Sequence, residues 1–177
     1  LIPHLRAFAR TLTGDPTAAD DLAQDAMMKA WDARASYQMG TNMKAWTFMI
    51  LRNQFYSEKR RSWRQSQLDQ EAAERTLVAV DDPEAPVALD ELRQALKTLP
   101  EEQREALILV GAGGFAYEEA AEICGCAVGT VKSRVSRARR ALQATLEKGG
   151  YGRDGKAAGD AMRSILADAD RLSGARN

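Results

Sequence analysis

Two short helical patterns separated by a tight turn occupy residues 115–142. Apolar residues recur before the turn, and they recur at i, i+3 and i+4 spacing after it. Two short helices joined by a turn that contains glycine form a helix-turn-helix, whose second helix enters the DNA major groove. The segment therefore predicts this motif, with its turn at Gly125, Cys126 and Ala127. The residues expected to be buried are Ala120, Ala121, Ile123, Val128, Val131, Val135, Ala138 and Leu142.

The second of these helices is strongly cationic. It has five basic residues within nine positions and no acid, although the chain as a whole has 25 basic and 25 acidic residues. Uncompensated cations attract the phosphate backbone, so DNA is the first partner to consider. An ordinary solvated helix could carry this charge, but it would explain neither the turn nor the apolar spacing. The five cations are Lys132, Arg134, Arg137, Arg139 and Arg140.

Length and composition limit the number of domains and argue against a membrane-spanning or zinc-binding protein. A chain of 177 residues suits one ordinary domain or two small ones, and no run approaches the roughly 18 apolar residues of a membrane span. Cys124 and Cys126, with His4 as the sole histidine, cannot complete a four-ligand zinc site. We expect reduced thiols, no cofactor and a cytoplasmic location. No cleavable signal pattern is visible, and because the chain begins at Leu1 we expect the natural protein to begin upstream.

The pattern along the chain predicts two small helical domains and an all-α fold. In the first, over residues 1–64, Asp20 is expected to cap a helix, and a third helix is expected over residues 43–61 with Trp46 and Ile50 in the core. Residues 65–88 are acidic and contain two prolines, which is typical of a flexible linker. The second domain covers residues 89–146, where a leucine stripe stops at Pro100 and a new helix begins with two acids.

The helix over residues 43–61 combines aromatic and basic residues. Such a helix cannot bury rings on every side, so some should remain near the surface beside the cations. Rings stack on exposed bases while cations follow the backbone, which is what single-stranded DNA requires. Duplex binding in one domain and single-strand binding in the other suggest a protein that recognises a promoter and opens it. The residues are Trp46, Phe48, Arg52, Phe55, Tyr56, Lys59, Arg60, Arg61, Trp63 and Arg64.

Three ordered motifs resemble the extracytoplasmic-function sigma factors of bacterial RNA polymerase. DDLAQDAMMKAWDA looks like the family's polymerase-docking helix, and MKAWTFMILRNQFYSEKRR is similar to its −10 helix. LPEEQREALILV and FAYEEAAEICGCAVGTVKSRVSRAR look like its −35 domain. The segment EEAAEICGCAVGTVKSRV further resembles the general-stress subgroup often called EcfG-like. The resemblance implies an alternative sigma factor that directs promoter-specific initiation, has no catalytic activity and serves general stress response genes.

The resemblance also implies functional residues. The docking helix would grip the clamp coiled coil of core RNA polymerase, Asn53 would read a flipped −10 base, and the helix-turn-helix would read the −35 duplex. Ser57 stands where relatives often have Asp or Asn, and Ser136 replaces a larger side chain, which leaves the promoter letters open. The polymerase-binding residues would be Asp21, Gln24, Asp25 and Trp31. The −10 residues would be Trp46, Asn53, Tyr56, Arg60 and Arg61. The −35 residues would be Thr130, Lys132, Ser133, Arg134, Ser136, Arg137 and Arg139.

The same subgroup implies a regulatory partner, a small and mostly helical anti-sigma factor. It would compete with core polymerase for the helix around residues 21–31, and the linker would let the domains reorient around it. The tail over residues 147–177 is glycine-rich and then amphipathic, so it is either a weakly ordered extension or a regulatory docking helix. The amphipathic positions are Met162, Ile165, Leu166, Ala169 and Leu172.

Two alternatives from other classes remain open at the level of sequence. One is an ordinary helix-turn-helix regulator whose first domain receives a signal or dimerises. Such a domain would usually be larger and would not need an aromatic and basic helix. The other is an enzyme with a DNA-binding appendage, but the chain has a single histidine, no nucleophile motif and no glycine loop that could bind phosphate.

Overall fold

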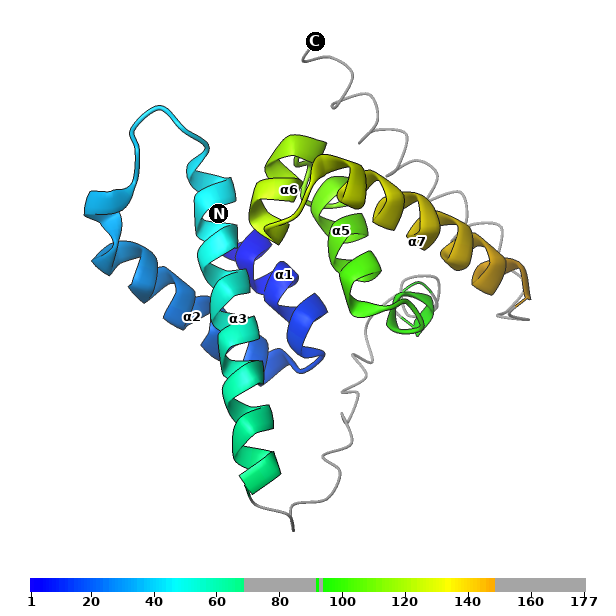
Figure 1. Cartoon of the computed structure of the whole chain (residues 1–177), viewed down its shortest axis with the longest axis horizontal. Coiled ribbons are helices and arrows are strands. Elements are labelled where there is room, and N and C mark those ends of the chain that lie inside the picture. Colours follow the sequence, from blue (N-terminus) through cyan, green and yellow to red (C-terminus); the bar gives the residue numbers. More distant parts are fainter. Residues whose placement is uncertain (69–91, 93, 149–177) are drawn as a thin grey trace. The chain divides into compact units, whose positions relative to one another are not determined.

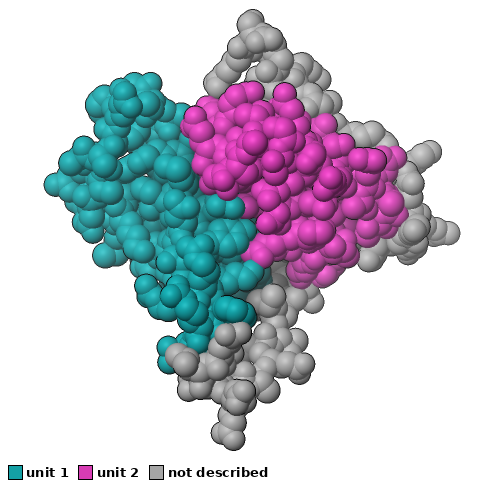
Figure 2. Space-filling view, in the orientation of Figure 1, with its two compact units in different colours: residues 1–80 teal, residues 81–177 magenta. Residues whose placement is uncertain are grey.

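The computed structural model describes residues 1–68, 92 and 94–148, and every structural statement below concerns these residues. The chain divides into two compact units, Leu1–Val80 and Asp81–Asn177, coloured teal and magenta in Figure 2. The division falls inside the predicted linker. The amphipathic pattern of the tail and most of the linker lie outside the described residues. The described residues form helices and turns without a strand, which confirms the all-α prediction.

The first unit contains three α-helices and a short 3-10 turn (Figure 1). These are α1 (Ile2–Thr13), α2 (Pro16–Asp32), η1 (Arg34–Ser36) and α3 (Met43–Leu68). The predicted cap at Asp20 is wrong, because α2 begins one turn earlier. Pro16 occupies the first turn of α2, and Asp15 caps the helix by accepting a hydrogen bond from the Ala18 amide at 2.7 Å. Asp20 lies within α2, with its Oδ1 3.3 Å from Nε of Arg6.

The core of this unit forms where α1, α2 and α3 meet. The rings of Phe8 on α1 and Phe48 on α3 stack with centroids 5.0 Å apart. The prediction that Trp46 and Ile50 belong to the core is wrong, since both are only half-buried. The buried apolar residues of α3 are instead Ala45, Phe48 and Leu51. The other buried apolar residues of this unit are Leu5, Ala9, Leu12, Ala19, Leu22, Ala23 and Ala26.

Helix α3 also ends later than predicted. It continues to Leu68, so the first residues of the expected linker are helical. No glycine or proline occurs between residues 61 and 68 to stop the helix, and the acidic, proline-containing composition begins only beyond it.

The second unit is built from α5 (Glu101–Gly111), α6 (Tyr117–Cys124) and α7 (Val128–Lys148). As predicted, Pro100 precedes α5, and Glu101 and Glu102 lie in its first turn. Helix α7 packs on both α5 and α6 (Figure 1). The burial of its predicted inner row is confirmed except at Val128, which is half-buried. Residues buried in this core include Ala106, Leu107, Leu109, Val110, Phe115, Ala120, Ala121, Ile123, Val131, Val135, Ala138 and Leu142.

Two glycines shape the turns of this unit. Gly125 has a φ of 62°, the left-handed conformation that ends α6, and the next amide, Cys126 N–H, donates to the Ala121 carbonyl at 3.1 Å. This turn confirms the predicted helix-turn-helix. In the connection before α6, a Cβ at Gly113 would lie 2.5 Å from the Leu109 carbonyl oxygen and 2.9 Å from the Phe115 ring. Only a residue without a side chain fits there.

Three further observations bear on the class of protein. Among the described residues, none of the helices is long and apolar enough to cross a lipid bilayer. In the same part of the chain, no group of three or more His, Cys, Asp or Glu side chains could hold a metal ion. Cys124 is buried and Cys126 is half-buried, and both are free thiols.

Candidate nucleic-acid and polymerase-binding surfaces

The face of α7 opposite its buried row is open to solvent and cationic. Lys132, Ser136, Arg137 and Arg140 are exposed, whereas Val131 and Val135 are buried beneath them. Because the apolar row holds this helix to α5 and α6, its polar face has a defined direction. The face presents charge and hydroxyl groups of the kinds that contact phosphates and base edges.

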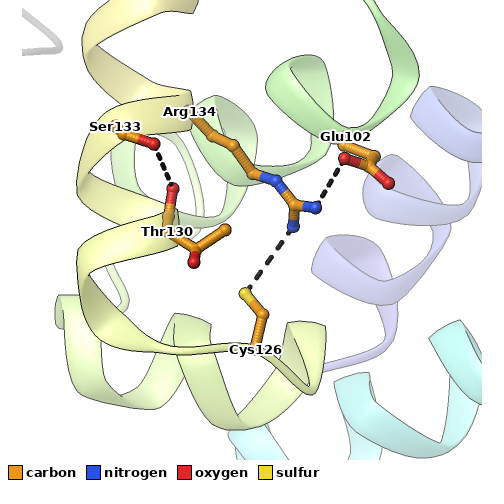
Figure 3. A network of polar contacts seen from close by, with 5 residues as sticks. All are labelled: Glu102, Cys126, Thr130, Ser133 and Arg134. Carbon is orange, nitrogen blue, oxygen red and sulfur yellow. Dashed lines mark hydrogen bonds and ion pairs between the residues drawn. The ribbon is translucent and has the colours of Figure 1, made fainter.

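Two of the side chains predicted to contact the −35 duplex also interact with residues of their own unit. The Lys132 ammonium lies 5.7 Å from the ring centroid of Tyr117, at the start of α6. Ser133 is half-buried, and its hydroxyl donates to the Thr130 carbonyl at 3.0 Å, which leaves its oxygen able to accept (Figure 3). Thr130 and Arg139 are also half-buried. Thr130, Ser133 and Arg139 are therefore less open to solvent than Ser136, Arg137 and Arg140.

Arg134 differs from the other cations of α7. Its guanidinium points toward α5 and the helix-helix turn, where it forms an ion pair with Glu102 (Figure 3). A second nitrogen, Nη1, lies 3.6 Å from Sγ of Cys126. Only 18% of the Arg134 side chain is exposed. The structure therefore separates Arg134 from the open face on which Lys132 and Arg137 lie.

Helix α3 presents rings and cations together. The Arg52 guanidinium lies 4.6 Å from the ring centroid of Tyr56, and the Lys59 ammonium lies 5.8 Å from that of Phe55. The two rings meet edge to face at 5.2 Å, and both are half-buried. Asn53, and further along the helix Arg60 and Arg61, are exposed. The surface thus offers ring faces, cations and an amide, which suits unpaired bases and their backbone.

Trp46 belongs to a different part of this surface. It is held by Tyr37, which precedes α3 in the loop over residues 37–42, with ring centroids 5.2 Å apart. The Tyr37 hydroxyl donates to the Thr41 carbonyl at 2.6 Å and so closes the loop. The contact of Tyr37 with Trp46 was not foreseen from the sequence. The two lie nine positions apart in the sequence, and no helical or strand spacing relates them.

The exposed face of α2 carries the four predicted docking residues. Asp21, Gln24 and Asp25 are exposed over two successive turns, and Trp31 is 69% exposed at the end of the helix. The Arg34 guanidinium lies 4.8 Å from the Trp31 ring centroid. Met28, which is 65% exposed, lies between these acids and Trp31 and was missed. Its i+3 and i+4 spacing from Asp25 and Gln24 could have indicated it.

The sequence of each unit matches a known family. Residues 1–65 match the family Sigma-70 region 2, and residues 89–142 match the family Sigma-70, region 4. The chain is 46% identical over 168 residues to the ECF RNA polymerase sigma factor EcfG of Rhodopseudomonas palustris, which covers 93% of this chain and 90% of that protein. The chain belongs to the ECF sigma factors. It is also 34% identical over 135 residues to the ECF RNA polymerase sigma-E factor of Escherichia coli K12, covering 69% of this chain and 70% of that one.

Two solved structures resemble this sigma factor. The sigma factor RpoE of Bartonella quintana, solved in complex with the anti-sigma factor NepR, is 47% identical with a TM-score of 0.74. The match covers 84% of this chain and 92% of that one. CnrH, solved in complex with the cytosolic domain of CnrY, is 26% identical with a TM-score of 0.61, covering 84% and 83%. Family membership decides against the alternative of an ordinary helix-turn-helix regulator.

A buried amide connects the candidate surfaces of α2 and α3. Gln54 on α3 is 4% exposed, and its Nε2 donates to Asp25 Oδ2 at 3.1 Å and to Glu58 Oε1 at 2.9 Å. One of the predicted docking acids on α2 is thereby fixed to the helix that carries the rings. Gln54 was missed because nothing in its sequence neighbourhood distinguishes it from an exposed glutamine.

Proposed function

We propose that this sigma factor divides promoter recognition between its two units, with α7 reading the −35 duplex and α3 binding the −10 element as it opens. The observation that carries the proposal is the open face of α7, on which Lys132, Ser136 and Arg137 lie opposite a fully apolar buried row. Arg and Lys suit guanine edges and phosphates, and Ser can serve either bases or phosphates. The proposed domain boundaries are 1–64, 65–88, 89–146 and 147–177.

On the −10 side, Asn53 is proposed to read an extruded base while neighbouring rings and cations hold the single strand. Asn53 is exposed on α3, and Tyr56 presents its ring beneath the Arg52 guanidinium. Arg60 and Arg61 follow on the next turns, where they are exposed and can track the backbone. The free-energy cost of extruding a base is lowest once the duplex is already opening. Melting of the −10 duplex and recognition of the extruded base therefore stabilise one another.

Core RNA polymerase is proposed to dock on α2 through Asp21, Gln24, Asp25 and Trp31. Exposed acids suit a basic partner surface, and an exposed tryptophan is a typical anchor at the centre of an interface. Met28 extends the apolar part of this surface. A sigma factor that works in this way resides in the cytoplasm, requires no cofactor and catalyses no reaction itself.

Regulation by a small helical anti-sigma factor follows from the relatives. One similar sigma factor was solved with an anti-sigma factor, and another relative has the name EcfG. We therefore assign this chain to the control of general stress response genes, with an inhibitor that covers the α2 surface and excludes core polymerase. The inhibitor's amphipathic helices would occupy apolar surface on both units.

Run-off transcription tests the central proposal. Purified chain plus core polymerase should start transcripts from a subset of promoters in a genomic library, whereas core polymerase alone should not. A library that yields no transcript would contradict the proposed function. A stable ternary complex of sigma factor, inhibitor and core polymerase in size-exclusion chromatography would contradict the exclusion step alone.

A further inference from the structure

The position of Arg134 is not that of a DNA contact. The exposed cations of α7 lie on its open face, whereas the Arg134 side chain is 18% exposed and directed toward α5. Its charge is already compensated, because Nη2 is ion-paired with Glu102 Oε2. To reach a phosphate, the guanidinium would have to leave this carboxylate.

The partners of Arg134 come from two other segments of the same unit. Glu102 lies in the first turn of α5, and Cys126, whose Sγ lies 3.6 Å from Nη1, forms the turn between α6 and α7 (Figure 3). The guanidinium is a rigid planar fork that can direct hydrogen bonds to two partners at once. A single side chain thereby ties the recognition helix to the helix beneath it and to the turn before it.

The same contact also removes an unfavourable charge. The Glu102 side chain is 65% exposed in the unit that carries the cationic face of α7. An uncompensated carboxylate there would repel DNA phosphates, and its pairing with Arg134 neutralises it.

We propose that Arg134 is a positioning residue: together with Glu102 it sets the orientation of α7 and does not itself contact DNA. This replaces the direct −35 role that the family resemblance implied for Arg134. The inference rests on the proposed function of α7 as the duplex-reading helix. It adds Glu102, which lies outside the recognition helix, to the residues that determine −35 binding.

Exchanging the two charges tests the pair without changing the net charge. Binding of the full chain would be measured on a double-stranded oligonucleotide whose −35 element was selected with the wild-type protein. Arg134→Glu should weaken binding by about tenfold, and the double variant that also carries Glu102→Arg should return to within about threefold of wild type. A double variant as weak as Arg134→Glu alone would overturn the proposal, because a glutamate facing phosphates cannot be rescued by an arginine on α5.

Salt dependence gives a second readout that loss of packing does not mimic. Each phosphate contact contributes about 0.9 to the slope of log K against log salt concentration. Arg134→Gln should weaken binding with the slope unchanged, whereas the control Lys132→Ala should lower the slope by about 0.9. A fall of that size in Arg134→Gln would show a phosphate contact and overturn the proposal. Failure of the wild-type chain to bind the duplex would instead contradict the proposed function.

Discussion

Helices α3 and α7 carry the proposed DNA-binding residues of the two units, and they differ in how they are held. The buried residues of α7 are uniformly apolar, and its exposed cations lie on the opposite side. The buried residues of α3 include Thr47 and Gln54, and several of its rings are half-buried. A helix with one apolar row can be oriented from its sequence alone. A helix whose core contains polar groups and whose surface contains rings cannot.

This comparison has a functional reason. A duplex-reading helix needs a rigid scaffold and a cationic face, which are separate demands met by separate residues. A helix that binds single-stranded DNA needs exposed rings, which are also the residues that most favour burial. In α3 the two demands compete for the same side chains. The cations beside Phe55 and Tyr56 keep these rings at the surface without leaving them fully exposed.

The largest expected effect concerns the proposed docking surface on α2, which lies outside both proposed DNA-binding helices. Changing Asp21 and Asp25 to Lys should weaken core polymerase binding by more than about 100-fold, because like charges then face a basic partner. Binding would be measured by fluorescence anisotropy with labelled sigma factor. Thermal unfolding should shift only slightly, since the lost contact of Asp25 with Gln54 is worth about 1 kcal/mol. Retained binding would place the polymerase interface elsewhere.

The next effect separates α7 from α3. Arg137→Ala should weaken −35 duplex binding by about 1–3 kcal/mol if Arg137 reads a base edge, and it should relax specificity at one position. Arg10→Ala removes the same charge from an exposed site on α1 and serves as the control. Equal losses in the two variants would show that net charge, and not the open face of α7, determines duplex binding.

The complementary variant acts on α3. Asn53→Ala should leave −35 duplex binding unchanged but slow open-complex formation by about tenfold, as expected for one lost hydrogen-bonded base contact of 1–2 kcal/mol. Permanganate footprinting of the −10 element would measure this. Ser62→Ala, at another exposed position further along α3, is the control. A duplex-binding defect in Asn53→Ala would contradict the division of labour between the two helices.

The smallest effect tests the connection between α2 and α3. Gln54→Met keeps the approximate volume but removes the hydrogen bonds to Asp25 and Glu58, so it should weaken core polymerase binding by about fivefold through a less fixed Asp25. Thr47→Val, which removes the buried hydroxyl that donates to the Met43 carbonyl at 2.7 Å, is a control for stability alone. If both variants bind core polymerase like wild type, Gln54 has only a structural role.

Local signals in the sequence were sufficient to predict several helices and turns of this protein. The spacing of Val131, Val135, Ala138 and Leu142 indicated the orientation of α7, and Gly125 marked the turn before it, because both depend on interactions within a few residues. The acids after Pro100 marked the start of α5 for the same reason. The family resemblance, which also rests on local motifs, is confirmed by the matches to both sigma-70 regions.

The tertiary structure decided what depends on partners far apart in the chain. It placed Phe48 and not Trp46 in the core, because Phe8 of α1 meets α3 at that position. It buried the glutamate Glu105 within α5, which composition alone would have left at the surface. It also turned Arg134 toward Glu102, 32 residues earlier in the chain. Sequence spacing determines which side chains share a helix face. Only packing against a second helix determines whether a charged side chain forms an ion pair within the protein or remains exposed and able to contact DNA.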